Sequence, residues 1–242
     1  MKIEGLTSPP PKSAARRGLK AHEERIPFGD AHLIRNRRGF RPCPWAFEVA
    51  RFAPVRTTDR VLDLGCGGGV LLHALGQVHG ETALRVGVEL DGDAADQARR
   101  NLVGDPYGPA GIIRGDVRRL PLRPCFQLVV ANPPFYPPGW GRQSADGATA
   151  AATHALHGGV REFLRAAGEA LAPGGQVVVV YDADHLVRLL LAIADAKLTT
   201  RRLRFLDDDR GSPARVLALA GRDGAGLTVE RLIFDLPNRG AP

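Results

Sequence analysis

The sequence FQLVVA at residues 126–131 is followed at once by Asn132, two prolines and an aromatic residue, Phe135. The first six residues are typical of a buried strand, because they form a short apolar run rich in β-branched side chains. Neither proline can extend a sheet, so one interpretation is a strand cap followed by a rigid turn. The other interpretation is a pocket that binds a flat molecule carrying an amino group. The rest of the chain decides between the two.

A glycine-rich turn follows an earlier strand, in the sequence VLDLGCGGGV. Asp63 stands two residues before the first glycine, and the glycines are Gly65, Gly67, Gly68 and Gly69. Glycines let the backbone turn sharply and approach a ligand closely, and open α/β sheets bind ligands at the carboxyl ends of their strands. The dinucleotide pattern G-x-G-x-x-G fails at Val70, and the Gly-Lys-Ser/Thr ending of a P-loop is missing.

Two further carboxylates follow the next two expected strands. Glu89, within GVELD, lies about 20 residues beyond the glycine turn, where an acidic side chain can accept both hydroxyls of a ribose. Asp116, within RGDVRRLP, could accept a hydrogen bond from an exocyclic adenine amine. Either acid could instead cap a helix, and we expect that role for Asp91 or Asp93. Acids at three successive strand ends, behind a glycine turn, favour a ligand site over capping alone.

Hydrophobic periodicity predicts alternating strands and helices after a short helix at 45–53. The expected strands span 60–65, 84–89, 111–115, 126–131, 176–181, 201–206, 214–220 and 227–234, and the expected helices span 70–78, 93–103, 160–171 and 183–196. Repeated strand–helix units with continuous apolar strands predict an α/β fold with a parallel sheet covered on both faces. The last three strands lack intervening helices, so we expect at least one to be antiparallel. Residues 26–43 are expected to be irregular.

The amino-acid composition limits which kinds of binding partner we expect. The net charge of +7 and the pI of about 9.9 favour a polyanion such as RNA. Only four of the 33 basic residues are lysine, and a GC-rich genome would produce the same arginine bias without any nucleic acid. The three cysteines lack CxxC spacing, which argues against disulfides and zinc and suits the reducing cytoplasm. No apolar run approaches the ~20 residues of a membrane span, so we expect no membrane partner.

Two further clusters are not expected to bind metal. His154 and His157 stand three residues apart, but no carboxylate or cysteine accompanies them. Asp207, Asp208 and Asp209 lack the spacing of an EF-hand, so we expect a solvated turn there.

In their order and spacing, VLDLGCGGG, GVELD, RGD and ANPPF resemble the class I S-adenosylmethionine-dependent methyltransferases, over residues from about 40 to 235. The resemblance implies a Rossmann-like fold with a mostly parallel seven-stranded sheet and an antiparallel strand near the C-terminus. In that family the glycine loop holds the methionine part of S-adenosylmethionine, the second-strand acid holds the ribose, and the third-strand aspartate reads the adenine. The implied cofactor-binding residues are Asp63, Gly65, Gly67, Gly69, Glu89 and Asp116.

The same resemblance gives the proline pair a chemical role. An amino group conjugated to a ring is a poor nucleophile, and acceptors that draw its hydrogens out of the ring plane concentrate the lone pair toward the methyl donor. Asn132 can offer its side-chain oxygen and Pro133 its backbone carbonyl, while Pro133 and Pro134 stiffen the loop. Phe135 offers a face for the base, worth about 1–3 kcal/mol. These four residues are the expected catalytic set.

An Asn-Pro-Pro-aromatic sequence marks methylation of adenine N6, guanine N2 or a glutamine amide among class I enzymes. The chain most resembles the tRNA(Val) adenine-N6 methyltransferases, through GFRPCPWAFEVARFAP (39–54), ATHAL (152–156) and REFLRAAGEALAPGGQVVVVY (161–181). The resemblance implies an S-adenosylmethionine-dependent N-methyltransferase acting on adenine N6 in tRNA. The alternatives are a protein glutamine amide, guanine N2 of rRNA, or a catalytically silent RNA-binding module that keeps the fold.

We expect three regions: a basic tail at 1–25, a lead-in at 26–56 and a methyltransferase domain at 57–236, forming a monomer. In the lead-in, Arg37, Arg38 and Phe40 could follow an RNA backbone. Beyond the proline pair, Trp140 and Arg142 are candidates for a substrate lid, and His154 for a substrate loop.

Overall fold

The computed structural model describes residues 18–37, 43–121, 123–135, 158–208, 211–224 and 226–233. Its strands are β1 (Glu23–Phe28), β2 (Ala31–Asn36), β3 (Arg60–Leu64), β4 (Leu84–Glu89), β5 (Ala110–Arg114), β6 (Phe126–Ala131), β7 (Leu171–Asp182), β8 (Thr199–Asp207), β9 (Pro213–Gly221) and β10 (Thr228–Ile233). Its helices are α1 (Ala46–Phe52), α2 (Val70–His79), α3 (Gly92–Asn101), α5 (Val160–Ala170) and α6 (Leu186–Asp195), with a 3-10 turn, η2, at Ala183–His185.

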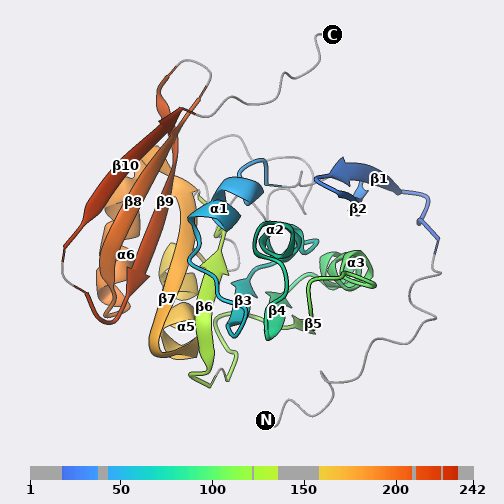
Figure 1. The fold of residues 1–242 in the computed structure, drawn as a ribbon, viewed down its shortest axis with the longest axis horizontal. Coiled ribbons are helices and arrows are strands. Elements are labelled where there is room, and N and C mark those ends of the chain that lie inside the picture. The colour runs from blue at the N-terminus through green and yellow to red at the C-terminus, as the bar shows by residue number, and fades with distance from the viewer. Residues whose placement is uncertain are drawn as a thin grey trace.

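The central sheet confirms the predicted fold class. Its strand order is β10-β8-β9-β7-β6-β3-β4-β5 (Figure 1). Strands β5, β4, β3, β6 and β7 are parallel to one another, whereas β9 is antiparallel to both β7 and β8. The sheet has eight strands, as the periodicity predicted, and one more than the seven that the resemblance implied. The strand predicted at 227–234 is β10, which joins the edge beside β8 and runs parallel to it.

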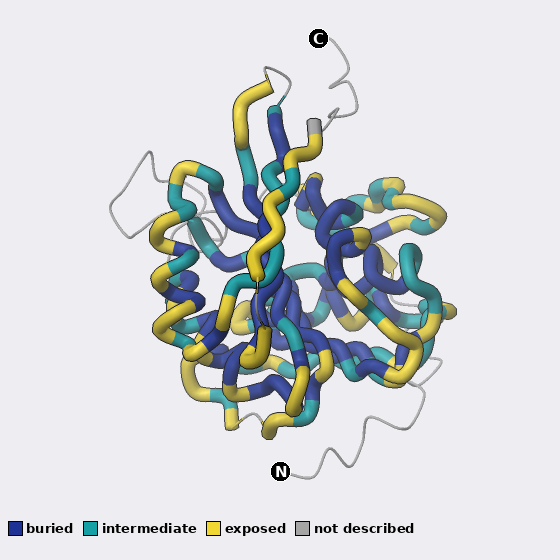
Figure 2. The backbone as a smooth tube through the Cα atoms, turned by 60° about the vertical axis from the view of Figure 1, so that its left-hand side comes forward, coloured by how far each residue is buried: buried dark blue, intermediate teal, exposed yellow. Residues whose placement is uncertain are grey.

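Helices cover both faces of the sheet, as the continuous apolar strands predicted. On one face, Val61 and Val130 pack with α1 and α2 in one cluster of buried side chains. On the other face, Leu64 and Val129 pack with side chains of α5 and α6, including Phe163. Figure 2 shows the buried strands running through the centre of the molecule, with the exposed residues on the outer turns, the helix faces and the edge strand β10. This two-sided core fixes the strand ends that carry the predicted site.

A buried charge network joins α2, β4 and the chain after α3. Asp105 accepts hydrogen bonds from Arg85 Nη2 at 2.9 Å, and its other oxygen lies 3.0 Å from His73 Nδ1. Burial alone would raise the pKa of Asp105, but the hydrogen bonds from His73 and Arg85 outweigh it and lower that pKa to about 2. Arg85 is fully buried yet paired, so the network anchors the helix that follows the glycine turn.

The expectation that residues 26–43 are irregular is wrong for the part of that range that the structure describes. β1 and β2 form an antiparallel hairpin in which Phe28 pairs with Ala31. Its two-residue turn begins at Gly29, whose φ of 55° favours glycine. The Gly-Asp pair at the turn is typical of a hairpin and could have predicted it. Pro27 and the weak alternation of apolar and polar residues in β1 argued against a strand there. The strand starts at Glu23, within the range expected to be tail.

The solvated turn expected at 207–209 is wrong for Asp207. This side chain is buried at the end of β8, and Arg231 of β10 donates from Nε to its Oδ2 at 2.6 Å. The neighbouring strand thus supplies a cation that the local sequence did not reveal. Asp208 does form a turn, in which its Oδ1 accepts from the Ser212 backbone N–H at 2.9 Å. No helix in the described ranges is long and apolar enough to cross a membrane.

Candidate active site

A cavity of about 670 Å³ lies at the carboxyl ends of β3, β4, β5 and β6. β3 has β4 on one side and β6 on the other, so the chain order reverses there, and such switch points are where open α/β sheets bind ligands. The predicted residues that line the cavity are Asp63, Gly65, Gly67, Glu89, Asp116, Asn132 and Pro134. Four separate stretches of sequence therefore meet at one site.

The glycine turn is held against β4 and leaves its backbone open to the cavity. The backbone N–H groups of Gly65 and Cys66 donate to the Val88 carbonyl at 2.8 and 3.0 Å. Gly67 has a φ of 53°, and a Cβ added there would meet no atom within 4 Å, so a ligand can approach the backbone closely. Gly69 also has positive φ but packs against Ala98 of α3 and does not line the cavity.

Asp63 is buried, and neither of its carboxylate oxygens has a hydrogen-bond partner among the described residues. Burial, and secondarily the negative charge of Glu89, raises the pKa of Asp63 well above its usual range. An unpaired buried carboxyl group is costly, and such groups persist where a ligand completes them. Asp63 therefore offers a strong acceptor to a cationic or hydrogen-bond-donating ligand group.

Glu89 is oriented by two backbone N–H groups. Gly67 donates to Oε2 at 2.8 Å and Asp91 donates to Oε1 at 2.8 Å. Each oxygen keeps further acceptor capacity for hydroxyl groups of a ligand. The Asp91 side chain accepts from the Ala94 N–H at 2.8 Å and caps α3, which confirms the role expected there.

Asp116 is partly exposed and is already paired. Arg118 donates from Nε and Nη2 to its two oxygens at 2.9 and 2.6 Å. These hydrogen bonds, with the positive charge of Arg118, lower the pKa of Asp116 to about 2. Asp116 is thus ionised throughout the neutral range, and Arg118, which also lines the cavity, lies beside any adenine that Asp116 would bind. Arg118 was not among the site residues predicted from the sequence.

Asn132 and the prolines continue β6 into the cavity. Ala131, the last residue of β6, pairs with Leu64 of β3, so Asn132 stands beside the start of the glycine turn. The side-chain oxygen Oδ1 of Asn132 is buried and has no hydrogen-bond partner among the described residues. Pro133 is buried, and Pro134 lines the cavity. The unpaired amide oxygen of Asn132 and the unpaired carboxylate of Asp63 therefore belong to the lining of the same cavity.

Phe135 does not line the cavity but is held by neighbouring strands. Tyr181 of β7 donates its hydroxyl to the Phe135 carbonyl at 3.3 Å, and the two rings meet edge to face with centroids 5.5 Å apart. The guanidinium of Arg215 on β9 lies 4.8 Å from the Phe135 ring centroid, and Asp182 accepts from Arg215 at 3.1 Å. Tyr181 and Arg215 could not be predicted from the local sequence, because strand pairing brings them to Phe135.

The candidates for substrate binding are only partly placed. Arg37 is exposed at the end of the hairpin, where its Nε donates to the Glu23 carbonyl at 3.1 Å, and it does not line the cavity. The others lie outside the described residues: Arg38, Phe40, Trp140, Arg142 and His154. The described part of the chain contains no cluster of three or more residues able to hold a metal ion.

The fold and the site together define a Rossmann-like methyltransferase. The chain belongs to the methyltransferase small domain family, whose model matches residues 49–195. It is 34% identical over 197 residues to the tRNA1(Val) (adenine(37)-N6)-methyltransferase of Aeromonas salmonicida, covering 81% of this chain and 82% of that protein. It is 30% identical over 219 residues to the protein of the same name from Tolumonas auensis, covering 89% and 91%.

Solved structures agree with this fold. A predicted O-methyltransferase from Agrobacterium tumefaciens matches with a TM-score of 0.60 and 19% identity, covering 78% of this chain and 86% of that one. TrmN from Thermus thermophilus matches with a TM-score of 0.54 and 23% identity, covering 72% of this chain and 47% of that one. At these identities the likeness concerns the fold alone.

Proposed function

We propose that this methyltransferase uses S-adenosylmethionine to methylate N6 of an adenine in tRNA. The observation that carries the proposal is the pair of unpartnered acceptors at adjacent strand ends, Asp63 for the methyl donor and Asn132 for the methyl acceptor. The names of the two relatives support adenine N6 in tRNA as the acceptor. The net charge of +7 suits a polyanion, and a tRNA substrate agrees with the expected cytoplasmic location.

The residues of the cavity fit S-adenosylmethionine. Asp63 provides an unpaired buried carboxyl group, the open backbone at Gly67 admits close contact, and Glu89 is oriented to accept ribose hydroxyls. Asp116 would accept from the adenine amine, with Arg118 holding it in place. When bound, S-adenosylmethionine supplies an electrophilic methyl group on a positively charged sulfur.

On the acceptor side, Asn132 and Pro133 would hold the amino group of the substrate base. One N–H of that group would donate to Asn132 Oδ1 and the other to the Pro133 carbonyl, which would draw both hydrogens out of the ring plane and concentrate the nitrogen lone pair toward the methyl donor. The amino nitrogen would gain positive charge as it accepts the methyl group that S-adenosylmethionine supplies, with the neutral thioether as the leaving group. The two oxygens stabilise this charge until one proton leaves to water. No general base is required.

Phe135 would present a face to the base, which must first leave its stack in the RNA. The edge contact from Tyr181 and the cation from Arg215 restrict the Phe135 ring before substrate arrives. A restricted ring loses less conformational entropy on stacking, so more of the stacking energy contributes to binding. Closeness and alignment of the reacting atoms then supply much of the rate acceleration.

The test is methyl transfer from isotope-labelled S-adenosylmethionine to unmodified tRNA, followed by digestion to nucleosides and mass spectrometry. We expect the label in N6-methyladenosine. Label in N2-methylguanosine, or in protein but not in RNA, would identify one of the alternative amino acceptors instead. Binding of tRNA without any binding of S-adenosylmethionine in calorimetry would establish a silent RNA-binding module. The matched control is Asn132→Ala, which should leave the tRNA unlabelled.

A further inference from the structure

Strand β2 forms part of the cavity wall, beside the glycine turn. The residues of β2 that line the cavity are Leu33, Ile34, Arg35 and Asn36. Their strand belongs to a hairpin that precedes the central fold in sequence and lies over α2 and α3 in space (Figure 1). The binding volume therefore depends on how the hairpin is fixed relative to the glycine turn.

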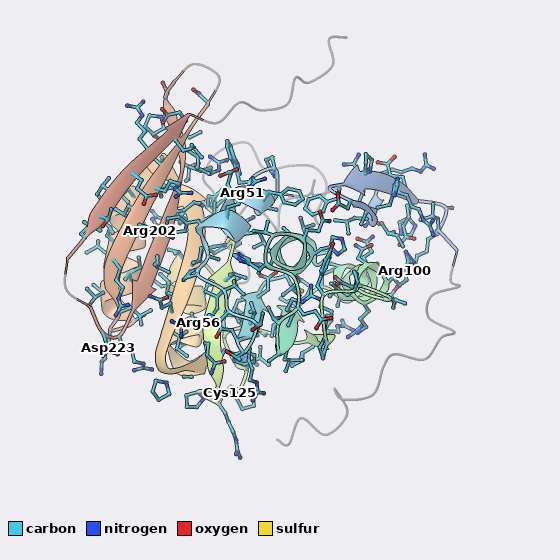
Figure 3. The ribbon with its side chains drawn as sticks, in the orientation of Figure 1. Arg51, Arg56, Arg100, Cys125, Arg202 and Asp223 are labelled. Atoms are coloured by element: carbon cyan, nitrogen blue, oxygen red, sulfur yellow. The ribbon has the colours of Figure 1, made fainter. Side chains whose placement is uncertain are left out.

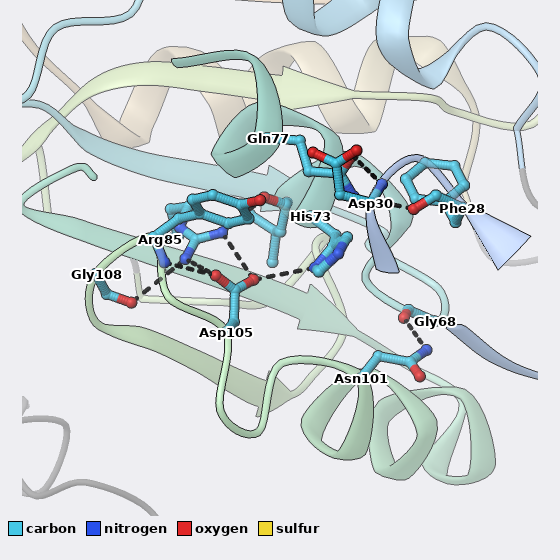
Figure 4. A network of polar contacts seen from close by, with 11 residues as sticks. Phe28, Asp30, Gly68, His73, Gln77, Arg85, Asn101, Asp105 and Gly108 are labelled. Carbon is cyan, nitrogen blue, oxygen red and sulfur yellow. Dashed lines mark hydrogen bonds and ion pairs between the residues drawn. The ribbon is translucent and has the colours of Figure 1, made fainter. Parts of the chain in front are cut away.

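One side chain, Asn101 at the end of α3, contacts both walls. Its Oδ1 accepts from the Ile34 N–H at 2.7 Å, and its Nδ2 donates to the Ile34 carbonyl at 3.1 Å. The same Nδ2 donates to the Gly68 carbonyl at 2.8 Å (Figure 4). The amide oxygen and the amide nitrogen of Asn101 therefore both form hydrogen bonds. Toward Ile34, the amide replaces the backbone groups that a neighbouring strand would offer. Asn101 bridges the hairpin and the glycine turn directly.

Other contacts hold the hairpin without touching the glycine turn. Gln77 on α2 donates to the Phe28 carbonyl at 3.0 Å and accepts from the Asp30 N–H at 3.1 Å, at the hairpin turn (Figure 4). Arg100 donates to Glu23 at 2.6 Å in a buried ion pair, and Figure 3 shows Arg100 on α3, on the side of the molecule that carries the hairpin. The hairpin is therefore fixed at several points, and the contact of Asn101 with Gly68 adds a separate link to the glycine turn.

We propose that Asn101 is a positioning residue for the methyl donor, setting the spacing between the glycine turn and the hairpin wall. The proposal rests on the proposed function, in which this cavity binds S-adenosylmethionine. Without the Asn101 amide, the Gly68 carbonyl and the Ile34 backbone groups lose their partners, and the glycine turn samples more conformations. Binding must then order the turn, and that entropy cost is subtracted from affinity.

The test compares Asn101→Ala with Gln77→Ala by titration calorimetry with S-adenosylmethionine. Both changes remove an amide that holds the hairpin, but only Asn101→Ala frees the glycine turn. We expect Asn101→Ala to weaken binding about 10- to 100-fold, as the loss of buried hydrogen bonds implies. Gln77→Ala should change the dissociation constant by less than about threefold. At saturating donor, Asn101→Ala should keep kcat close to wild type, so the loss lies in KM for the donor.

Every outcome bears on the proposal. Equal binding by Asn101→Ala and wild type would overturn it, even if urea unfolding shows a less stable protein, because Asn101 would then be structural only. If both variants bind S-adenosylmethionine equally weakly, the proposal would also be overturned. Any loosening of the hairpin would then be enough to reduce affinity, and the contact of Asn101 with Gly68 would have no special role. If Asn101→Ala does not fold, Asn101→Asp keeps the size and the acceptor atom but loses both donors, and the same weakening is expected. A wild-type protein that binds no S-adenosylmethionine would refute the proposed function itself.

Discussion

Asp63 and Asn132 stand at the ends of two adjacent parallel strands, and the carboxylate oxygens of one and the amide oxygen of the other are buried without hydrogen-bond partners among the described residues. Buried polar atoms are nearly always satisfied in native proteins, so two such groups at one cavity indicate where ligand atoms belong. The side of β3 would hold the methyl donor and the side of β6 the amino acceptor. The register that pairs Leu64 with Ala131 brings the two halves together.

We predict that Asp63→Asn stabilises the protein in the absence of ligand. Burial raises the pKa of Asp63, so between the usual carboxyl pKa and that raised pKa the folded state binds a proton that the unfolded state releases. Wild-type stability therefore falls as pH rises through this window. The neutral amide removes this dependence, and we expect a gain of about 1–3 kcal/mol at neutral pH. Urea unfolding of the wild type and of Asp63→Asn at pH 5 and pH 8 measures both the gain in stability and its dependence on pH. A variant that is less stable at both pH values would contradict the prediction.

The same carboxyl group should make donor affinity depend on pH. A cationic ligand favours the ionised form of Asp63, whose pKa burial has raised, so affinity should increase as pH rises through that pKa and binding should release a proton. Asp116, with a pKa of about 2, is ionised throughout the neutral range and adds no such dependence. Calorimetry in buffers of different ionisation enthalpy measures the released proton. The release should vanish in Asp63→Asn, and its persistence there would assign it to another group.

Tyr181→Phe should impair the acceptor side alone. The change removes the hydroxyl that donates to the Phe135 carbonyl but keeps the edge contact between the rings. We expect a loss of about 0.5–1.5 kcal/mol in unfolding free energy. The value of kcat/KM for tRNA should fall by up to about tenfold, because the Phe135 loop is less restricted. Affinity for S-adenosylmethionine serves as the control, and a change there would show that the two halves of the site are not separable.

Much of the core could be predicted from the sequence because its signals are local. The apolar strands, the glycine turn and the acids at strand ends each follow from a few consecutive residues, and the parallel order of the strands brought Asp63, Glu89, Asp116 and Asn132 to one cavity. The predicted helix at 160–171 ends at Ala170, since Leu171 already pairs with Phe126 of β6.

The parts that escaped prediction depend on contacts between distant residues. The hairpin is fixed by Asn101, which lies 67 residues beyond Ile34 in sequence. Tyr181 reaches Phe135 from 46 residues away, and Arg215 reaches the same ring from the antiparallel strand β9. Local pattern carries no information about such pairings, because they follow from register and packing once the sheet has formed.

The central claim is that Asn132 holds the acceptor amine and takes no part in binding the methyl donor. Asn132→Ala, measured for methyl transfer to tRNA and for binding of S-adenosylmethionine on the same preparation, tests it most directly. We predict that kcat falls by at least about 100-fold, as expected when an oxygen that stabilises developing charge is removed. The dissociation constant for S-adenosylmethionine should stay within about a factor of three of wild type. Retained methyl transfer, or loss of donor binding in step with activity, would contradict the account.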